Sequence, residues 1–131
     1  MSKEIRPMIY QKDRKYEILH KDKYKKYNYF ILNLGTHPTA YIEIPEGHKL
    51  FGKHYDDIYI NVHGGLTYSE DDLLGIKSKS WFIGWDYAHA GDYMGYEELF
   101  GFINPNDKKW TTEEIIKDCK NVIEQIIEMR G

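Results

Sequence analysis

The sequence predicts an α+β domain, in which an antiparallel sheet of five to six strands packs against one long amphipathic helix at the C-terminus. Short β-branched and aromatic runs, separated by clusters of Gly, Pro, Asn and Asp, fill residues 16–85 and are typical of strands. Apolar residues near the C-terminus recur at helical spacing instead. The 131 residues, 41% of them hydrophobic, suit one core, so we expect a single domain over 1–131.

The strand signals follow one another closely along the first two thirds of the chain. Most of the connections are short enough for hairpins, but residues 45–56 form a longer polar stretch that we expect to be a surface loop. A sheet with one face covered by a helix leaves the other face free, which favours a homodimer or larger homo-oligomer. We expect strands near residues 15–20, 27–34, 39–44, 57–63, 66–69 and 79–86.

The C-terminal helix has the clearest signals in the chain. Thr111 and Glu114 have the spacing of a capping box, and Trp110 and Ile115 that of a hydrophobic staple. The pattern predicts a helix of about 18 residues, long enough to cover one face of a small sheet. A second, short helix is expected at 95–100. The apolar residues at helical spacing are Ile115, Ile116, Cys119, Val122, Ile123, Ile126 and Ile127.

Hydropathy and cysteine usage predict a cytoplasmic protein. The apolar runs at 29–32 and 81–83 are far shorter than the roughly 20 residues of a membrane helix. Residues 1–6 are charged and lack the apolar run of a secretory signal. Cys119 is the sole cysteine, which excludes a disulfide within the chain and a Cys-x-x-Cys site, and we expect it to pack in the core.

Charge is unevenly distributed along the chain. Residues 14–26 hold six Lys or Arg and two acids, whereas residues 43–98 hold eleven acids and four lysines. With Tyr24 and Tyr27 among its lysines, the basic stretch could contact phosphates and stack on bases. Lysines also protect exposed sheet edges, which is the simpler interpretation, and nucleic-acid binding is therefore disfavoured. The 15% aromatic content suits a binding surface or a core capped by tyrosines.

Strand alternation predicts a polar site on the outer face of the sheet. In the strand at 57–63, His63 lies opposite the aliphatic side chains, and in the strand at 79–86, Asp86 lies opposite the tryptophans. If both apolar faces point at the helix, His63 and Asp86 share the outer face and can meet on neighbouring strands. Gly64, Gly65 and Gly84 would let a ligand approach the backbone, although turn chemistry explains a Gly-Gly pair equally well.

Two further residues extend this group if the chain leaves strand geometry after Asp86. Asp86, His89 and Asp92 are spaced by three, and with His63 they give two imidazoles and two carboxylates, which suit zinc, manganese or iron. The same residues could instead form a hydrogen-bonded network or bind an organic ligand. The full set of candidate ligand-binding residues is His63, Gly64, Gly65, Asn61, Gly84, Asp86, His89, Asp92, Tyr68 and Trp85.

The remaining motifs exclude several common chemistries. The chain has no P-loop and no Gly-x-Gly-x-x-Gly, which disfavours the standard ATP and dinucleotide folds. No Ser or Cys stands in a nucleophile elbow, so we assign no catalytic residue. His48 and His54 fall in the 45–56 loop, where we expect them to be exposed.

Four segments, 40–48, 55–58, 62–68 and 81–92, together resemble a family of small uncharacterised proteins of bacteria, phages and other mobile elements. His63-Gly-Gly-Leu-Thr-Tyr68 and Gly84-Trp-Asp-Tyr-Ala-His-Ala-Gly-Asp92 carry most of this resemblance, which spans roughly residues 27–127. Relatives often have Cys where this chain has Tyr87, which removes a candidate metal ligand here. The resemblance implies a phage or mobile-element setting and, with it, interference with host defence.

These observations favour a binding protein that sequesters a nucleotide-like ligand or caps a host protein. The aromatic content, the open polar sheet face and the lack of a complete catalytic constellation support this hypothesis. The alternative is a hydrolase of phosphodiesters that uses a divalent metal held by His63, Asp86, His89 and Asp92. Nucleic-acid binding through residues 21–26 ranks third.

Overall fold

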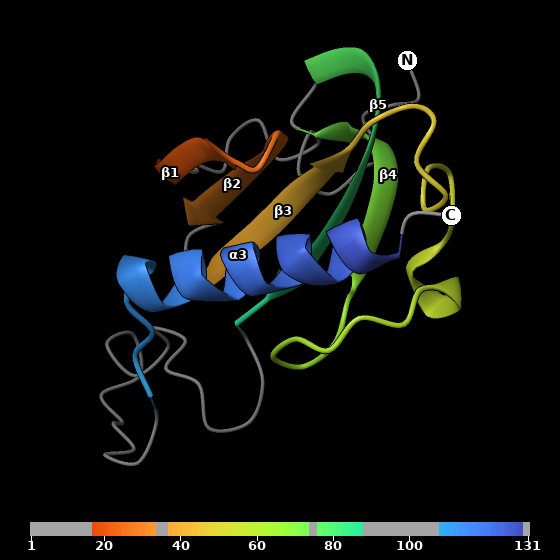
Figure 1. Ribbon diagram of the computed structural model, residues 1–131. Helices are drawn as coiled ribbons and strands as arrows, with labels where there is room; N and C mark the ends of the chain where they lie inside the picture. Colours follow the sequence, from red (N-terminus) through yellow and green to blue (C-terminus); the bar gives the residue numbers. More distant parts are fainter. Residues whose placement is uncertain (1–16, 34–36, 74–75, 88–107, 130–131) are drawn as a thin grey trace.

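A twisted five-stranded sheet and one long helix make up the regular part of the computed structural model, which describes residues 17–33, 37–73, 76–87 and 108–129 (Figure 1). The elements in chain order are β1 (Glu17–Tyr24), β2 (Tyr27–Asn33), β3 (Pro38–Ile44), the 3-10 turn η2 (Tyr55–Asp57), β4 (Tyr68–Leu73), β5 (Ile76–Asp86) and α3 (Thr112–Glu128).

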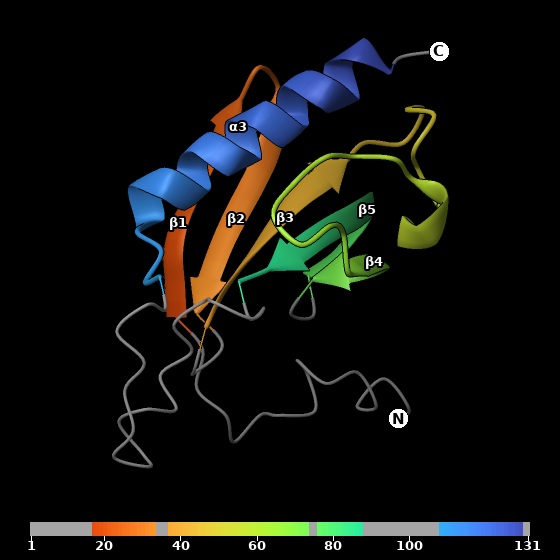
Figure 2. The same ribbon diagram turned by 90° about the horizontal axis from the view of Figure 1, so that it is seen from below.

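The sheet order is β1-β2-β3-β5-β4, and every neighbouring pair is antiparallel. α3 crosses one face of the sheet, as the view from below shows (Figure 2). The predicted α+β class, with an antiparallel sheet packed on a long C-terminal helix, is therefore confirmed. Among the described residues no helix is long and apolar enough to cross a membrane. The short helix expected at 95–100 falls outside the described residues.

The main core lies between α3 and the sheet. Thr111 and Glu114 form the predicted capping box, which fixes where the helix begins. Alternate residues of the strands point at the helix, because side chains alternate across a strand. The helix contributes Ile115, Cys119, Val122, Ile123 and Ile126, and the sheet contributes Tyr29, Ile31, Ala40, Ile42, Ile44, Ile83 and Trp85. Cys119 is buried, as expected.

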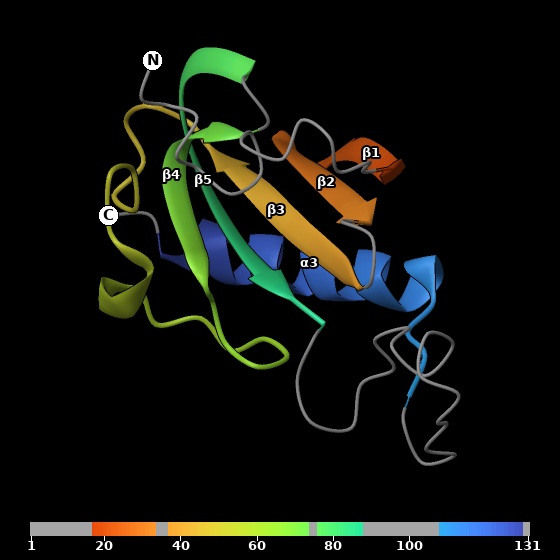
Figure 3. The same ribbon diagram turned by 180° about the vertical axis from the view of Figure 1, so that it is seen from behind.

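A second apolar cluster lies on the face of the sheet away from α3, which we call the outer face. Figure 3 shows the ribbon from that side. Phe30, Leu32, Tyr41 and Phe82 form this cluster, with the half-buried Tyr68 packed against it. The Tyr41 ring lies over Gly84, where an added Cβ would come within 2.5 Å of Tyr41 Cδ1 and 2.7 Å of the Ala40 carbonyl oxygen. Glycine at position 84 therefore makes room for a tyrosine of the neighbouring strand.

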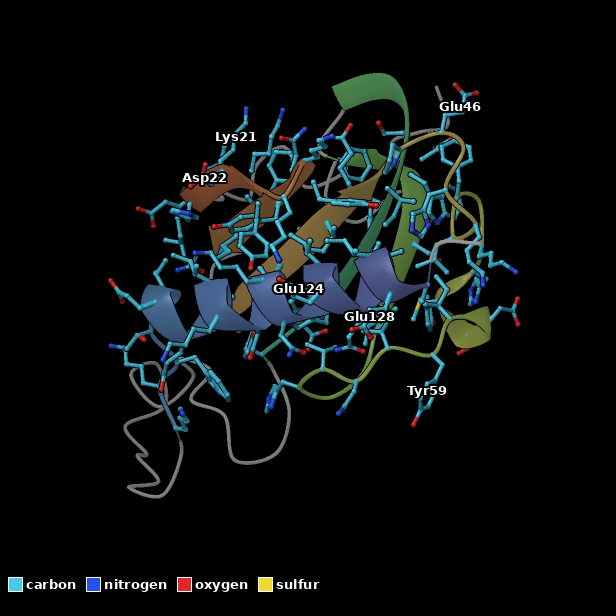
Figure 4. The ribbon with its side chains drawn as sticks, in the orientation of Figure 1. Lys21, Asp22, Glu46, Tyr59, Glu124 and Glu128 are labelled. Atoms are coloured by element: carbon cyan, nitrogen blue, oxygen red, sulfur yellow. The ribbon has the colours of Figure 1, made fainter. Side chains whose placement is uncertain are left out.

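The strand predicted at 57–63 is wrong. Residues 55–57 form η2, and residues 58–62 belong to no strand of the sheet. The alternation is nevertheless real: Ile58 and Ile60 are buried, while Tyr59 is 90% exposed and points away from the protein (Figure 4). Gln125 of α3 supplies the backbone partners, since Asn61 N–H donates to its Oε1 at 2.9 Å and its Nε2 donates to the Asn61 carbonyl at 2.8 Å.

The loop at 45–56 is anchored to the helix through His48. His48 Nδ1 accepts from the Leu50 N–H at 3.0 Å, so its Nε2 carries the proton that bonds the Ile126 carbonyl of α3 at 3.1 Å. His48 is thus half-buried and structural, contrary to the expectation of an exposed loop histidine. His54 is exposed as expected, and its Nδ1 accepts from Asp56 N–H at the start of η2.

The β1–β2 hairpin is tied to the helix by Glu124. The Tyr24 hydroxyl donates to the Glu124 carboxylate at 2.7 Å, and Lys25 Nζ lies 2.7 Å from the same oxygen. Lys25 and Lys26 form the turn at φ values of 48° and 76°. Residues other than glycine adopt this left-handed conformation at a cost in free energy. The hydrogen bond and ion pair hold the turn against the helix.

Substituting Gly84→Ala should lower the free energy of unfolding by about 1–3 kcal/mol, because the new methyl group overlaps the Tyr41 ring and the Ala40 carbonyl. Urea denaturation measures this change. The same penalty is expected in a Tyr41→Phe background, which keeps the ring and removes only the hydroxyl. A loss below about 0.5 kcal/mol would show that β3 and β5 yield to the methyl group at little cost.

Candidate functional site

The predicted site residues separate onto two sides of the sheet. In β5 the alternation is as predicted: Trp85 packs in the helix-side core, while Gly84 and Asp86 belong to the outer face. His63 lies on the helix side, where its ring stacks on Tyr87. The expectation that His63 and Asp86 share a face is therefore wrong. The segment before His63 is hydrogen-bonded to α3 and does not pair with a strand of the sheet.

Three rings meet on the helix side, and we call His63, Tyr87 and Trp110 the ring cluster. His63 stacks on Tyr87 with 5.1 Å between ring centroids and 7° between ring planes. Trp110 lies 4.7 Å from His63 and 4.9 Å from Tyr87, tilted by 53° and 52°. Tyr87 is fully buried, whereas His63 and Trp110 are half-buried. Tyr87 is thus the floor of the cluster.

Each ring comes from a different part of the chain. Tyr87 directly follows β5, and its N–H donates to the Pro38 carbonyl at 3.1 Å, which continues the pairing with β3. Trp110 directly precedes Thr111, the N-cap of α3. His63 ends the segment that Gln125 holds against the helix. The ring cluster therefore lies where the sheet, the helix and the 58–63 segment meet.

A cation lies against the edge of the ring cluster. Lys108 Nζ is 4.1 Å from the centroid of the Trp110 ring and 3.0 Å from a Glu114 carboxylate oxygen. The backbone hydrogen bond from Thr111 and the contact with Lys108 together hold the pKa of Glu114 below its usual value. Cation–π contacts of this kind contribute about 0.5–2 kcal/mol. The site thus combines aromatic surface with positive charge.

The Tyr87 hydroxyl is held neutral and in place. It accepts from Trp85 Nε1–H at 2.9 Å and donates to the Asp118 carboxylate of α3 at 2.6 Å. Burial, followed by the hydrogen bond to Asp118, raises the pKa of Tyr87 above its ordinary value of 10.0. This network connects the end of β5 to α3 beneath the ring cluster.

The predicted residues on the outer face form a separate group. Asp86 accepts from the Thr67 hydroxyl at 3.3 Å, and the Tyr68 ring meets the Tyr41 ring edge-on at 5.1 Å. Burial raises the pKa of Tyr41 to about 12. The side chain of Tyr41 occupies the space above Gly84 through which a ligand would approach the backbone. Gly84, Asp86 and Tyr68 are therefore brought together, but away from His63.

Gly64 and Gly65 form the turn that follows His63. Their φ values of 70° and 81° lie in the left-handed region that favours glycine, and Gly65 N–H donates to the Val62 carbonyl at 2.9 Å. The turn returns the chain to the sheet, where Thr67 N–H bonds the Gly84 carbonyl at 2.9 Å. Gly64 and Gly65 therefore have the structural role of a turn, and this turn helps to position His63.

The metal hypothesis depends on residues that the structure does not describe. His89 and Asp92 lie outside the described residues. Within the described residues no group of three or more His, Cys, Asp or Glu side chains is placed to hold a metal ion. His63 and Asp86 cannot ligate one ion together in this arrangement, since they belong to opposite sides of the sheet.

Sequence reasoning misses most of the ring cluster. The sequence pattern presents Trp110 only as part of a helix staple, and Tyr87 only as the position where relatives have Cys. The parity that places Trp81, Ile83 and Trp85 on the helix face extends to Tyr87, and this signal could have identified the buried tyrosine. Lys108 and Asp118 carry no such pattern. No family model matches the chain, and no match was found among curated proteins or solved structures.

Replacing Tyr87 by Phe should lower the free energy of unfolding at neutral pH by about 1–3 kcal/mol, because the Trp85 N–H and the Asp118 carboxylate lose their partner. The wild-type protein should lose stability as the pH rises above 10.0, since an unfolded tyrosine ionises there while the folded Tyr87 stays neutral. The variant should lose stability less steeply over that range.

Urea denaturation at a series of pH values measures both effects. Tyr41→Phe is the variant for comparison, because it removes another buried tyrosine, whose pKa is raised to about 12. It shows how much of the loss of stability at alkaline pH comes from Tyr41. An alkaline slope in Tyr87→Phe as steep as in the wild type would contradict the assignment.

Replacing Gln125 by Met should release the 58–63 segment from α3, because it removes both side-chain hydrogen bonds to Asn61. We expect a stability loss of about 1 kcal/mol and faster amide hydrogen exchange at Asn61. Asn121→Ala removes only the bond between Asn121 Oδ1 and Gln125 Nε2 and should leave that exchange rate near the wild-type value. Unchanged exchange at Asn61 in Gln125→Met would contradict the anchoring role.

Proposed function

We propose that this protein binds a planar, negatively charged small molecule, such as a nucleotide, at the ring cluster. The observation that carries the proposal is the meeting of His63, Tyr87 and Trp110, with Lys108 over the Trp110 ring. Aromatic rings provide a surface for a base, and a lysine provides a charge for a phosphate.

Stacking on half-buried rings is the main contribution we expect to affinity. Stacking of a base on an aromatic side chain contributes about 1–3 kcal/mol. Tyr87 is held rigidly by Trp85 and Asp118, so the floor of the cluster is ordered before a ligand arrives. Ordering a site in advance lowers the entropy cost of binding.

The chemistry of Tyr87 favours binding over catalysis. Its hydroxyl already makes two hydrogen bonds, and burial keeps it neutral, so it is a poor nucleophile and a poor general base. The neighbouring Asp118 is occupied by the same hydroxyl. Two of the four residues of the hydrolase alternative, His63 and Asp86, lie on opposite sides of the sheet, which supports the binding hypothesis ahead of a metal-dependent hydrolase.

The resemblance to proteins of phages and mobile elements suggests the biological use. A protein that binds a nucleotide-like signal of the host lowers its free concentration and so interferes with a defence response. Capping of a host protein is the other form of this hypothesis. In that form, the protein would bind a host partner, and nucleotides would have no effect on its stability.

Thermal-shift and calorimetric titrations with mono-, di- and cyclic nucleotides test the proposal. We expect at least one nucleotide to raise the melting temperature. Trp110→Leu, which keeps an apolar residue next to the helix, should weaken its binding about 5- to 150-fold. Lys108→Glu should also weaken binding, with wild-type binding decreasing as salt rises. Lys49→Glu, at an exposed position of the 45–56 loop, is the matched charge control and should bind as the wild type does.

Two results would overturn the proposal. One is that no nucleotide changes the melting temperature of the wild-type protein. The other is that Trp110→Leu and Lys108→Glu, with wild-type circular dichroism spectra, bind a nucleotide as tightly as the wild type.

A further inference from the structure

The ring cluster connects a buried tyrosine to the surface through contacting aromatic rings. Tyr87 is 0% exposed, so a dissolved reactant cannot touch its hydroxyl. Trp110 is half-buried, and its ring centroid lies 4.9 Å from that of Tyr87, within the range of aromatic rings in contact. Tryptophan and tyrosine are the aromatic side chains that lose one electron most readily, and contacting rings exchange electrons rapidly. Trp110 is therefore a route by which an oxidant at the surface can reach Tyr87.

A proton acceptor is already bonded to the Tyr87 hydroxyl. Tyr87 Oη donates to a carboxylate oxygen of Asp118 at 2.6 Å, a distance suited to direct proton transfer. A phenol becomes a strong acid when it loses an electron, so Asp118 takes the proton as the electron leaves. The Trp85 Nε1–H, with its nitrogen 2.9 Å from Oη, stays bonded to the oxygen. The transfer leaves Tyr87 uncharged, which matters because an unpaired charge is costly to bury.

The charges around the ring cluster set the direction of electron transfer. Lys108 Nζ lies 4.1 Å from the centroid of the Trp110 ring and disfavours a second positive charge there, although Glu114 offsets part of this effect. The carboxylate of Asp118 has the opposite effect on Tyr87, because it attracts positive charge and accepts the proton. A radical cation at Trp110 is thus disfavoured relative to a phenoxyl radical at Tyr87.

We propose that Tyr87 is a redox-active tyrosine, which loses one electron through Trp110 and its proton to Asp118. The oxidant is a small one-electron acceptor, such as an oxygen-centred radical. Trp110 first reduces this oxidant and becomes a radical cation. Tyr87 then gives an electron to Trp110 and a proton to Asp118. The products are neutral Trp110, a phenoxyl radical at Tyr87 and a protonated carboxyl group at Asp118. A thiolate or ascorbate supplies the electron that restores Tyr87, and Asp118 returns the proton.

This activity goes beyond the proposed binding of a nucleotide and does not depend on it. Tyr87 is a poor nucleophile and a poor base, but neither property prevents the loss of an electron. Moving the oxidised site from Trp110 to Tyr87 replaces a half-exposed radical with one that is buried and hydrogen-bonded. The radical is thus shielded from reactions at the surface until a reductant arrives.

Pulse radiolysis of the whole protein with azide radicals tests the proposal, because these radicals take one electron from tryptophan in preference to tyrosine. Transient absorption distinguishes the tryptophan radical from the phenoxyl radical. In the wild type, without any nucleotide, the first should convert into the second at a rate that does not depend on protein concentration. The conversion should be slower in D2O, because the proton moves with the electron.

Three variants assign the steps. Tyr87→Phe should remove the fastest conversion, since phenylalanine is not oxidised. Trp110→Leu should also remove it, because the entry point is lost while both hydrogen bonds of the Tyr87 hydroxyl stay in place. Asp118→Asn should slow it by about 100-fold or more, because an amide is a far weaker proton acceptor than a carboxylate. Circular dichroism checks that each variant is folded.

Two matched controls should keep the fastest conversion. Tyr41→Phe removes a buried tyrosine of the outer face, and Trp81→Leu removes another half-buried tryptophan. The proposal is overturned if folded Tyr87→Phe or folded Trp110→Leu converts as fast as the wild type. Conversion in the wild type only at rates that rise with protein concentration also overturns it. An unchanged rate in folded Asp118→Asn, or in D2O, overturns the transfer of the proton to Asp118.

Discussion

Burial of one side of α3 against the sheet is the constraint on which the rest of the structure depends. Ile115, Val122, Ile123 and Ile126 are at most 1% exposed, and full burial of such a side chain stabilises a fold by about 1.5–3 kcal/mol. The helix can begin only after its capping box at Thr111, so the apolar contact and the cap together fix its position along the sheet. The position of α3 in turn determines the positions of the segments that contact it.

The ring cluster is a consequence of that arrangement. Asp118 lies one position before the buried Cys119, so the contact that buries the helix also brings its carboxylate to the Tyr87 hydroxyl. Gln125 lies one position before the buried Ile126 and holds the backbone of Asn61. His63, two residues after Asn61, is thereby placed against the Tyr87 ring. Polar side chains next to the buried face of the helix thus hold the residues of the ring cluster in place.

Much of the fold could be predicted from the sequence because its signals are local. The capping box and the parity of Trp81, Ile83 and Trp85 each depend on neighbours in the chain, and the structure confirms both. The 57–63 segment could not be predicted, because alternation reports only that alternate residues are buried and not what bonds the backbone. Its partner Gln125 is 64 residues away. The contact of Tyr87 with Trp110 likewise depends on packing across the fold.

The polar contacts of Lys108 determine how an anion could enter the ring cluster. Lys108 is already paired with one Glu114 oxygen, while the other Glu114 oxygen accepts from the Thr111 N–H in the capping box. A phosphate that approaches Lys108 must compete with Glu114 for the ammonium group. Glu114 can release Lys108 and still cap the helix through its other oxygen, so the exchange does not require the helix to unwind. The contribution of Lys108 to anion binding is therefore the difference between two exposed ion pairs, each of them weak, so stacking on the rings contributes more of the binding free energy.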